Sequence, residues 1–131
     1  MITHPKGDIY HALKVDEGCF ESFGEAYFTT VHYGVIKGWK KHTEMTLNLI
    51  VPNGEIRFVL FDNRTNLQSQ FQEIKLSKEN YYRLTIPPMI WVGFQGLSNR
   101  NSMLLNIANL LHDPLEVDKK NINEIEFDWS L

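Results

Sequence analysis

Cysteine is nearly absent from the sequence, since Cys19 is the single one among 131 residues. One cysteine excludes an intramolecular disulfide and a zinc site built from several cysteines. Proteins of a reducing compartment typically contain this little cysteine.

Long hydrophobic runs and a strong excess of one charge are absent as well. No apolar run approaches the length of a transmembrane helix, and the N-terminal residues MITHPKGDIYHAL lack the apolar core of a signal peptide. The net charge of −3 gives no electrostatic reason to expect binding to nucleic acid or to an anionic membrane. We therefore predict a cytoplasmic protein with neither a nucleic-acid nor a membrane partner.

The remaining composition is that of a globular protein. Hydrophobic residues make up 43% of the chain and charged residues 22%, which is typical of a folded soluble protein. A chain of 131 residues is long enough for one hydrophobic core and too short for two. We predict a single domain over residues 1–131.

Strand-like segments dominate the chain. Apolar and polar residues alternate in MTLNLIV (45–51) and in IRFVLFD (56–62), and the Asn53-Gly54 pair between them predicts a tight hairpin. Turn signals such as DNRTN (62–66) separate the other segments. Further strands are predicted at 25–33, 71–76, 81–86, 90–94 and 102–110. Short strands with few helical stretches indicate an all-β sandwich or barrel.

The segment SMLLNIANLL, which begins at residue 102, also permits a helix. Leu104, Ile107 and Leu111 are three and four residues apart, as on one face of a helix. We favour a strand because the segment follows a series of strands.

A basic cluster of Lys40, Lys41 and His42 begins another alternating stretch. Alternation places Lys40 and His42 on one face of a strand and Lys41 on the other. The first face continues with Glu44, Thr46 and Asn48. Such a polar stripe favours a ligand pocket, and the alternative is a solvated strand edge. In a pocket, His42 would be a general base, and Lys40 would stabilise an enolate or act as the base itself.

Four segments carry a resemblance to a known family. They are Gly7-Asp8, GVIKGW (34–39), GEIRFVLFDNR (54–64) and LSKENYYRLTIPPMIWVGFQGLS (76–98). Together they resemble the dTDP-4-dehydrorhamnose 3,5-epimerase-like cupins, in consistent order over residues 7–131. The resemblance implies a double-stranded β-helix, or jelly roll, with little helix and an internal pocket. It also implies a homodimer that acts on a nucleotide-linked 4-keto sugar and needs no cofactor.

The resemblance further indicates which residues meet the substrate. Lys37 aligns with the family arginine that contacts the nucleotide phosphates, and the alternative is a surface lysine. Glu25 and Tyr27 align with polar pocket residues. We predict that Asn48 and Asn106 complete the substrate site, although a buried Asn106 is equally satisfied by bonding to backbone.

At the catalytic positions the chain departs from the family. Lys40 falls where the epimerases have their catalytic histidine, and His42 falls where sugar 3,4-ketoisomerases have the second histidine of a His-x-His pair. The family's active-site lysine maps near Thr46 and its catalytic tyrosine near Leu105 or Asn106, and neither is retained. No aspartate that would orient the base is identifiable.

The metal-ligand positions of the wider cupin group predict that no metal is bound. Here these positions read Lys40, His42, Leu47 and Val92. A protonated lysine repels a cation, and leucine and valine have no donor atom.

Our interpretation is an epimerase or isomerase of a nucleotide-linked 4-keto-6-deoxy sugar in surface-polysaccharide biosynthesis. His42, or Lys40, removes the proton alpha to the ketone, and the neighbouring cation holds the enolate. The alternative is a non-catalytic sugar- or nucleotide-binding cupin that has lost the epimerase residues. An interaction module in a biosynthetic complex has no positive signal in the sequence.

Overall fold

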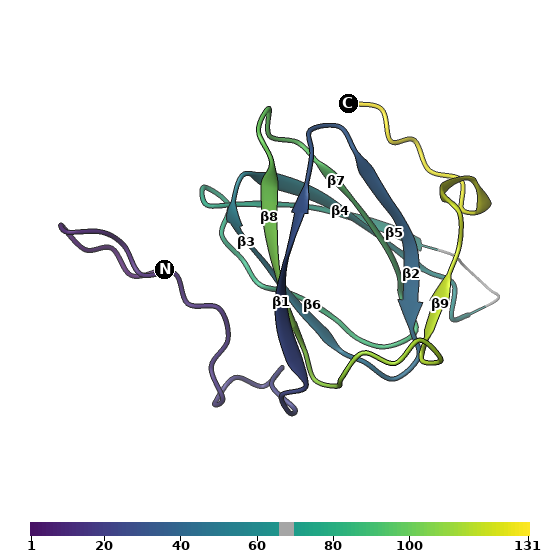
Figure 1. The fold of residues 1–131 in the computed structure, drawn as a ribbon, viewed down its shortest axis with the longest axis horizontal. Helices are drawn as coiled ribbons and strands as arrows, with labels where there is room; N and C mark the ends of the chain where they lie inside the picture. The colour runs from purple at the N-terminus through teal and green to yellow at the C-terminus, as the bar shows by residue number, and fades with distance from the viewer. Residues whose placement is uncertain (66–69) are drawn as a thin grey trace.

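Two β-sheets make up nearly all of the protein in the computed structural model, which describes residues 1–65 and 70–131 (Figure 1). One sheet has the strand order β1-β8-β3-β6 and the other β5-β4-β7-β2-β9, and neighbouring strands are antiparallel. The strands are β1 Glu25–Val31, β2 Ile36–His42, β3 Leu47–Asn53, β4 Glu55–Asp62, β5 Gln70–Ser77, β6 Leu84–Ile86, β7 Trp91–Gly96, β8 Ser102–Ala108 and β9 Val117–Lys119. In the described residues, helical structure is limited to the 3-10 turn η1 Ile122–Glu124. The predicted all-β fold with little helix is confirmed.

Most strands lie where the alternation predicts them. The segment with two interpretations forms strand β8, with alternate residues buried, so the strand prediction is confirmed. Strand β9 had no sequence signal that predicted it. The turn predicted at 62–66 runs into residues 66–69, which lie outside the described residues. Within the two described ranges, no helix is long or apolar enough to cross a membrane.

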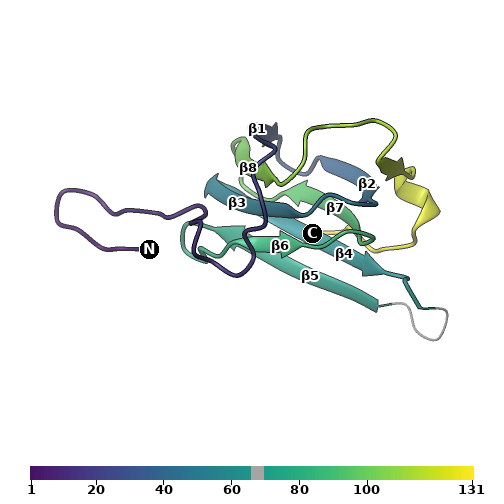
Figure 2. The same ribbon diagram turned by 90° about the horizontal axis from the view of Figure 1, so that it is seen from below.

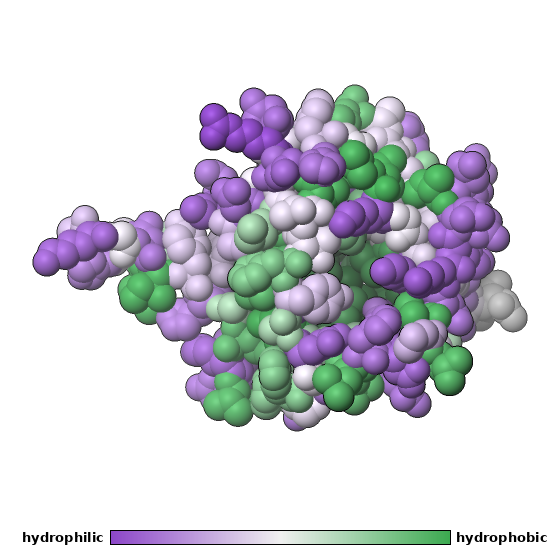
Figure 3. All heavy atoms as spheres, viewed as in Figure 1, coloured by the Kyte–Doolittle hydropathy of each residue, from purple (hydrophilic) through white to green (hydrophobic). Residues whose placement is uncertain are grey.

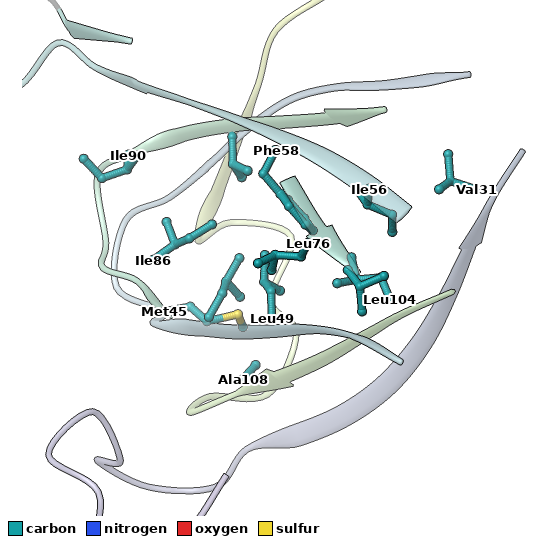
Figure 4. Packing of buried hydrophobic residues seen from close by; sticks show 13 residues of the cluster. Val31, Met45, Leu49, Ile56, Phe58, Leu76, Ile86, Ile90, Leu104 and Ala108 are labelled. Atoms are coloured by element: carbon teal, nitrogen blue, oxygen red, sulfur yellow. The ribbon is translucent and has the colours of Figure 1, made fainter. Parts of the chain in front are cut away.

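The main core lies between the two sheets (Figures 2 and 4). Leu49 of β3 and Leu104 of β8, from one sheet, share a buried cluster with Ile56 and Phe58 of β4, from the other. Because alternate side chains of a strand point to opposite faces, each strand contributes every second residue to this cluster. Burial of these side chains is the main driving force that holds the sheets together.

A second apolar cluster covers the outer face of the sheet that contains β2. Trp39 and Trp91 pack there with Ile125 and Trp129 of the C-terminal segment. The indole N–H of Trp39 donates to the carbonyl oxygen of Ile122 at 3.3 Å, which fixes this segment against the sheet. The C-terminal residues therefore shield one face, and both faces of β2 are covered.

The hairpin predicted around Asn53 and Gly54 is wrong. β3 pairs with β6 and β8, whereas β4 pairs with β5 and β7, so the chain passes from one sheet to the other at Gly54. Gly54 has a φ of 77°, as the Asn-Gly signal implies, so the turn exists but does not pair its flanking strands. Instead, the Ser102 hydroxyl accepts from the N–H of Glu55 at 3.1 Å and donates to its carbonyl at 2.9 Å. These bonds satisfy the backbone at the corner.

Gly54→Ala is expected to lower the free energy of unfolding by about 1–3 kcal/mol, because a non-glycine residue is strained at this φ. A Cβ there would also lie 2.8 Å from Ser102 Cα. Urea denaturation measures the change. Gly18→Ala is the control, since a Cβ at Gly18 meets nothing within 4 Å. Equal unfolding free energies for the two variants would contradict the role given to this corner.

Candidate active site

A cavity of about 300 Å³ opens between the two sheets. Its walls are apolar where Leu47, Leu49 and Leu104 meet Val92 and Phe94. The polar lining residues are Tyr27, Thr29, Lys37, Lys40, His42, Asn106, His112 and Lys119. Figure 3 shows the opening as a hollow with hydrophobic depth and hydrophilic side chains around it. An apolar pocket with a few convergent polar groups is the usual form of a small-molecule site.

Five of the seven predicted site residues line this cavity: Tyr27, Lys37, Lys40, His42 and Asn106. Glu25 and Asn48 are not among its lining residues. Glu25 starts strand β1, two residues before Tyr27. Asn48 is buried elsewhere, and its Oδ1 accepts a 2.6 Å hydrogen bond from the Thr85 hydroxyl.

The continuous polar stripe predicted from Lys40 to Asn48 is wrong. β2 ends at His42, and β3 begins at Leu47 in the other sheet. The intervening residues cross between the sheets, so the alternation does not carry through. Lys40 and His42 line the cavity as predicted, but on β3 it is Leu47 and Leu49 that line it, and Asn48 points to the other face.

His42 is bonded to a buried carboxylate. Its Nδ1 lies 2.7 Å from Oε1 of Glu116, a residue that is only 7% exposed. The other carboxylate oxygen accepts backbone hydrogen bonds from Glu44 at 3.0 Å and Met45 at 2.9 Å. Burial alone would raise the pKa of Glu116, but the bonds from His42 and these two N–H groups outweigh it and lower the pKa.

This geometry determines the tautomer of His42. An ionised carboxylate accepts hydrogen bonds and cannot donate one, so Nδ1 of His42 must carry the proton. Nε2 is then left with a lone pair, and His42 lines the cavity. The arrangement is that of an oriented general base. Glu116 thus fills the role that the sequence left unassigned, and since it is 74 residues from His42 on an irregular segment, no local pattern marks it.

A group of lysines lies beside His42. Lys40 on β2 is directly opposite Lys119 on β9, whereas the next pair in the register, Lys41 and Asp118, is an ion pair at 3.5 Å. Lys37 also lines the cavity, and its Nζ donates to the carbonyl of Thr30 at 3.0 Å. Burial lowers the pKa of Lys40, and the charges of Lys119 and Lys37 lower it further.

A tyrosine and an amide lie on the opposite sheet. Nδ2 of Asn106, on β8, donates to the hydroxyl of Tyr27, on β1, at 3.0 Å. Burial raises the pKa of Tyr27 and the charge of Glu25 adds to the rise, while the bond from Asn106 opposes it. Asn106 Oδ1 is buried and has no hydrogen-bond partner within residues 1–65 and 70–131.

The four metal-ligand positions of the cupin pattern do converge, because Lys40, His42, Leu47 and Val92 all line the cavity. These side chains do not form a metal-ligand set. Nor do three or more His, Cys, Asp or Glu side chains gather into a possible metal site anywhere in the described part of the chain. Metal-free chemistry stays a prediction.

Comparison with known proteins places this fold and cavity in a family. The structure is similar to that of a dTDP-sugar isomerase from Desulfovibrio desulfuricans, with a TM-score of 0.89 and 31% identity over 98% of this chain and 85% of that one. This chain belongs to the dTDP-sugar isomerase family. The resemblance to the 3,5-epimerase-like cupins is therefore confirmed. No family model matches the sequence.

Two further relatives of this dTDP-sugar isomerase family member extend the likeness. A dTDP-4-dehydrorhamnose 3,5-epimerase from Elizabethkingia anophelis has the same fold, with a TM-score of 0.81 and 17% identity over 99% of this chain and 77% of that one. A probable low-salt glycan biosynthesis epimerase of Haloferax volcanii is 25% identical over 89% of this chain and 78% of its own length. The predicted cupin jelly roll is confirmed.

Glu116→Gln is expected to change how stability depends on pH. The folded-state pKa of Glu116 is below its ordinary value of 4.5, so its charge stabilises the fold above that value. This contribution is lost as the pH falls through the folded-state pKa. Urea denaturation between pH 7 and pH 3 should show a steeper loss of stability in the wild type than in Glu116→Gln. Glu126→Gln, at an exposed position, should behave like the wild type, and a Glu116→Gln profile that does so too would refute the buried ion pair.

Proposed function

We propose that this protein epimerises or isomerises a nucleotide-linked 4-keto-6-deoxy sugar in surface-polysaccharide biosynthesis. The observation that carries the proposal is His42, oriented by Glu116, beside Lys40 in a mainly apolar cavity. A proton next to a ketone is removed readily when a base, a cation for the enolate oxygen and a low-dielectric site are present together. This cavity has all three.

In the proposed reaction, Nε2 of His42 takes the proton from the carbon next to the ketone. The electrons of the broken C–H bond move onto the ketone oxygen, where the ammonium group of Lys40 stabilises the enolate. The assignment of His42 as the base, with Lys40 as the cation, follows from Glu116, which stabilises the imidazolium that forms. Proton transfer of this kind requires no cofactor and no metal.

The lysines support a substrate that carries phosphate. Like charges directly opposite on neighbouring strands are destabilising, so Lys40 and Lys119 are placed at an energetic disadvantage in the free protein. A diphosphate at the mouth of the cavity would remove this repulsion. Lys40 and Lys119 also line an adjoining surface pocket together with Lys120, which leaves room for the nucleotide outside the sugar site.

A second candidate is a non-catalytic sugar- or nucleotide-binding cupin. Lys40 occupies the position of the family's catalytic histidine, and Asn106 lies near that of its catalytic tyrosine. These replacements favour a protein that keeps the cavity and has lost the reaction. The His42–Glu116 pair favours the enzyme, because nucleotide binding alone gives no reason to orient an imidazole in this way.

We also propose a homodimer in the cytoplasm, in line with the sequence-based expectation. β1 is an edge strand of its sheet, and Phe28 on it is 63% exposed. The N-terminal residues project away from the sheets (Figures 1 and 2). An open strand edge with an exposed aromatic residue suits pairing with a second copy. Sedimentation equilibrium tests this part of the proposal.

Incubation with dTDP- or GDP-4-keto-6-deoxy sugars in deuterated water is expected to place deuterium at C3 or C5, as detected by NMR. His42→Asn and Lys40→Met should each reduce the exchange rate by about 100-fold or more, since they remove the base and the enolate cation. His32→Asn is the control, because His32 is exposed, does not line the cavity, and bonds to Asn101. Binding without exchange across this substrate panel would refute catalysis and support the second candidate.

Lys119→Met is expected to weaken the binding of dTDP by about 10-fold, the size of one charge-assisted hydrogen bond to phosphate. Isothermal titration calorimetry at two salt concentrations measures the loss and shows whether it is electrostatic. Lys75→Met, on β5 away from the cavity, is the matched control. Unchanged affinity in Lys119→Met would place the phosphates elsewhere.

A further inference from the structure

Two proton-carrying side chains lie on opposite walls of the cavity. His42 ends strand β2 of one sheet, and Tyr27 is near the start of β1 in the other. In Figure 1, β1 and β2 come together at their connecting turn and diverge toward the ends that hold these residues. Both side chains line the same cavity, so a sugar ring bound between the sheets would meet one on each face.

The Tyr27 hydroxyl is held in a defined position. Tyr27 is directly opposite Asn106 in the β1–β8 register, and Asn106 Nδ2 donates to the phenol oxygen at 3.0 Å. Because the phenol oxygen is the acceptor in this bond, its own proton stays available for donation. Asn106 thereby acts as a positioning residue for Tyr27.

The remaining oxygen of Asn106 also points to a ligand. The side chain is 93% buried, since the residue is 7% exposed, and Oδ1 has no partner among the residues that the structure describes. A buried acceptor without a hydrogen bond is unfavourable by about 1–3 kcal/mol. A sugar hydroxyl in the cavity would satisfy it, and this would hold the ring next to the Tyr27 hydroxyl.

The other side chains on this wall are poor proton donors. Leu47, Leu49 and Leu104 are apolar, and Thr29 has a hydroxyl too weakly acidic for the role. The raised pKa of Tyr27 keeps its phenol protonated at neutral pH, so a proton is there to be given. Tyr27 is thus the lining residue of this wall with a usable acidic proton.

On the basis of the proposed function, we infer that Tyr27 is the catalytic acid and that the enzyme inverts the carbon next to the ketone. His42 breaks the C–H bond from one face, and its electrons form the enolate. When the ketone re-forms, the same carbon takes the proton of the Tyr27 hydroxyl from the other face, which leaves a tyrosinate. Water at the cavity mouth then removes the proton from His42 and returns one to Tyr27. One C–H bond is broken and one is made, so the configuration is inverted and no oxidant is needed.

Tyr27→Phe separates this inference from the proposed function. In deuterated water, we expect Tyr27→Phe to lower the rate of product formation by about 100-fold or more while His42-dependent exchange continues. Deuterium should then accumulate in the recovered substrate, because the enolate is reprotonated from the His42 side. In the wild type, deuterium should appear in the product, at a carbon of inverted configuration. Tyr33→Phe is the matched control, since Tyr33 is exposed and outside the cavity.

Each result has a distinct meaning. Wild-type turnover by Tyr27→Phe would overturn the inference and leave the proposed function intact. A wild-type product with its ketone moved and the configuration retained would also overturn it, since one face would then suffice. No exchange in the wild type with any substrate of the panel would overturn both. An Asn106→Leu variant with the same partitioning of label as Tyr27→Phe would support the positioning role.

Discussion

The carboxylate of Glu116 is the interaction on which the rest of the site depends. One oxygen bonds to His42, the other accepts the N–H groups of Glu44 and Met45, and the backbone carbonyl accepts both the N–H and the hydroxyl of Thr43. A single buried residue therefore holds the base and the segment in which the chain crosses between the sheets. Since a buried carboxylate is stable only when its acceptor positions are filled, the crossing and the orientation of His42 are coupled.

The cavity is a part of the sandwich that the core leaves unfilled. Leu47, Leu49 and Leu104 belong to the main core cluster and also line the cavity, so the same side chains stabilise the fold and exclude water from the site. The two walls then differ in chemistry. The sheet that contains β2 contributes the imidazole and the lysines, while the sheet that contains β1 contributes a phenol and an amide. This division gives a bound ring two unlike faces.

Much of the architecture was predictable because it rests on local patterns. Alternation placed most strands, and Asn53-Gly54 correctly marked a backbone with positive φ. The pairing across that turn was wrong, since a turn signal describes the bend and not the partner strands. The stripe from Lys40 to Asn48 failed for a related reason: alternation holds only within one strand, and the chain changes sheets after His42. Family-like spacing placed Lys40 and His42 in the cavity correctly.

The sequence by itself determined the fold class, the family resemblance and the side chains that β2 contributes to the cavity, because these depend on residue type and short-range period. Only the tertiary structure decided which groups act together. Glu116 is 74 residues from His42, and Asn106 is 79 residues from Tyr27, yet each pair is joined by a hydrogen bond. Contacts between distant segments follow from sheet pairing and from the need to satisfy buried polar atoms, and neither leaves a local signal in the chain.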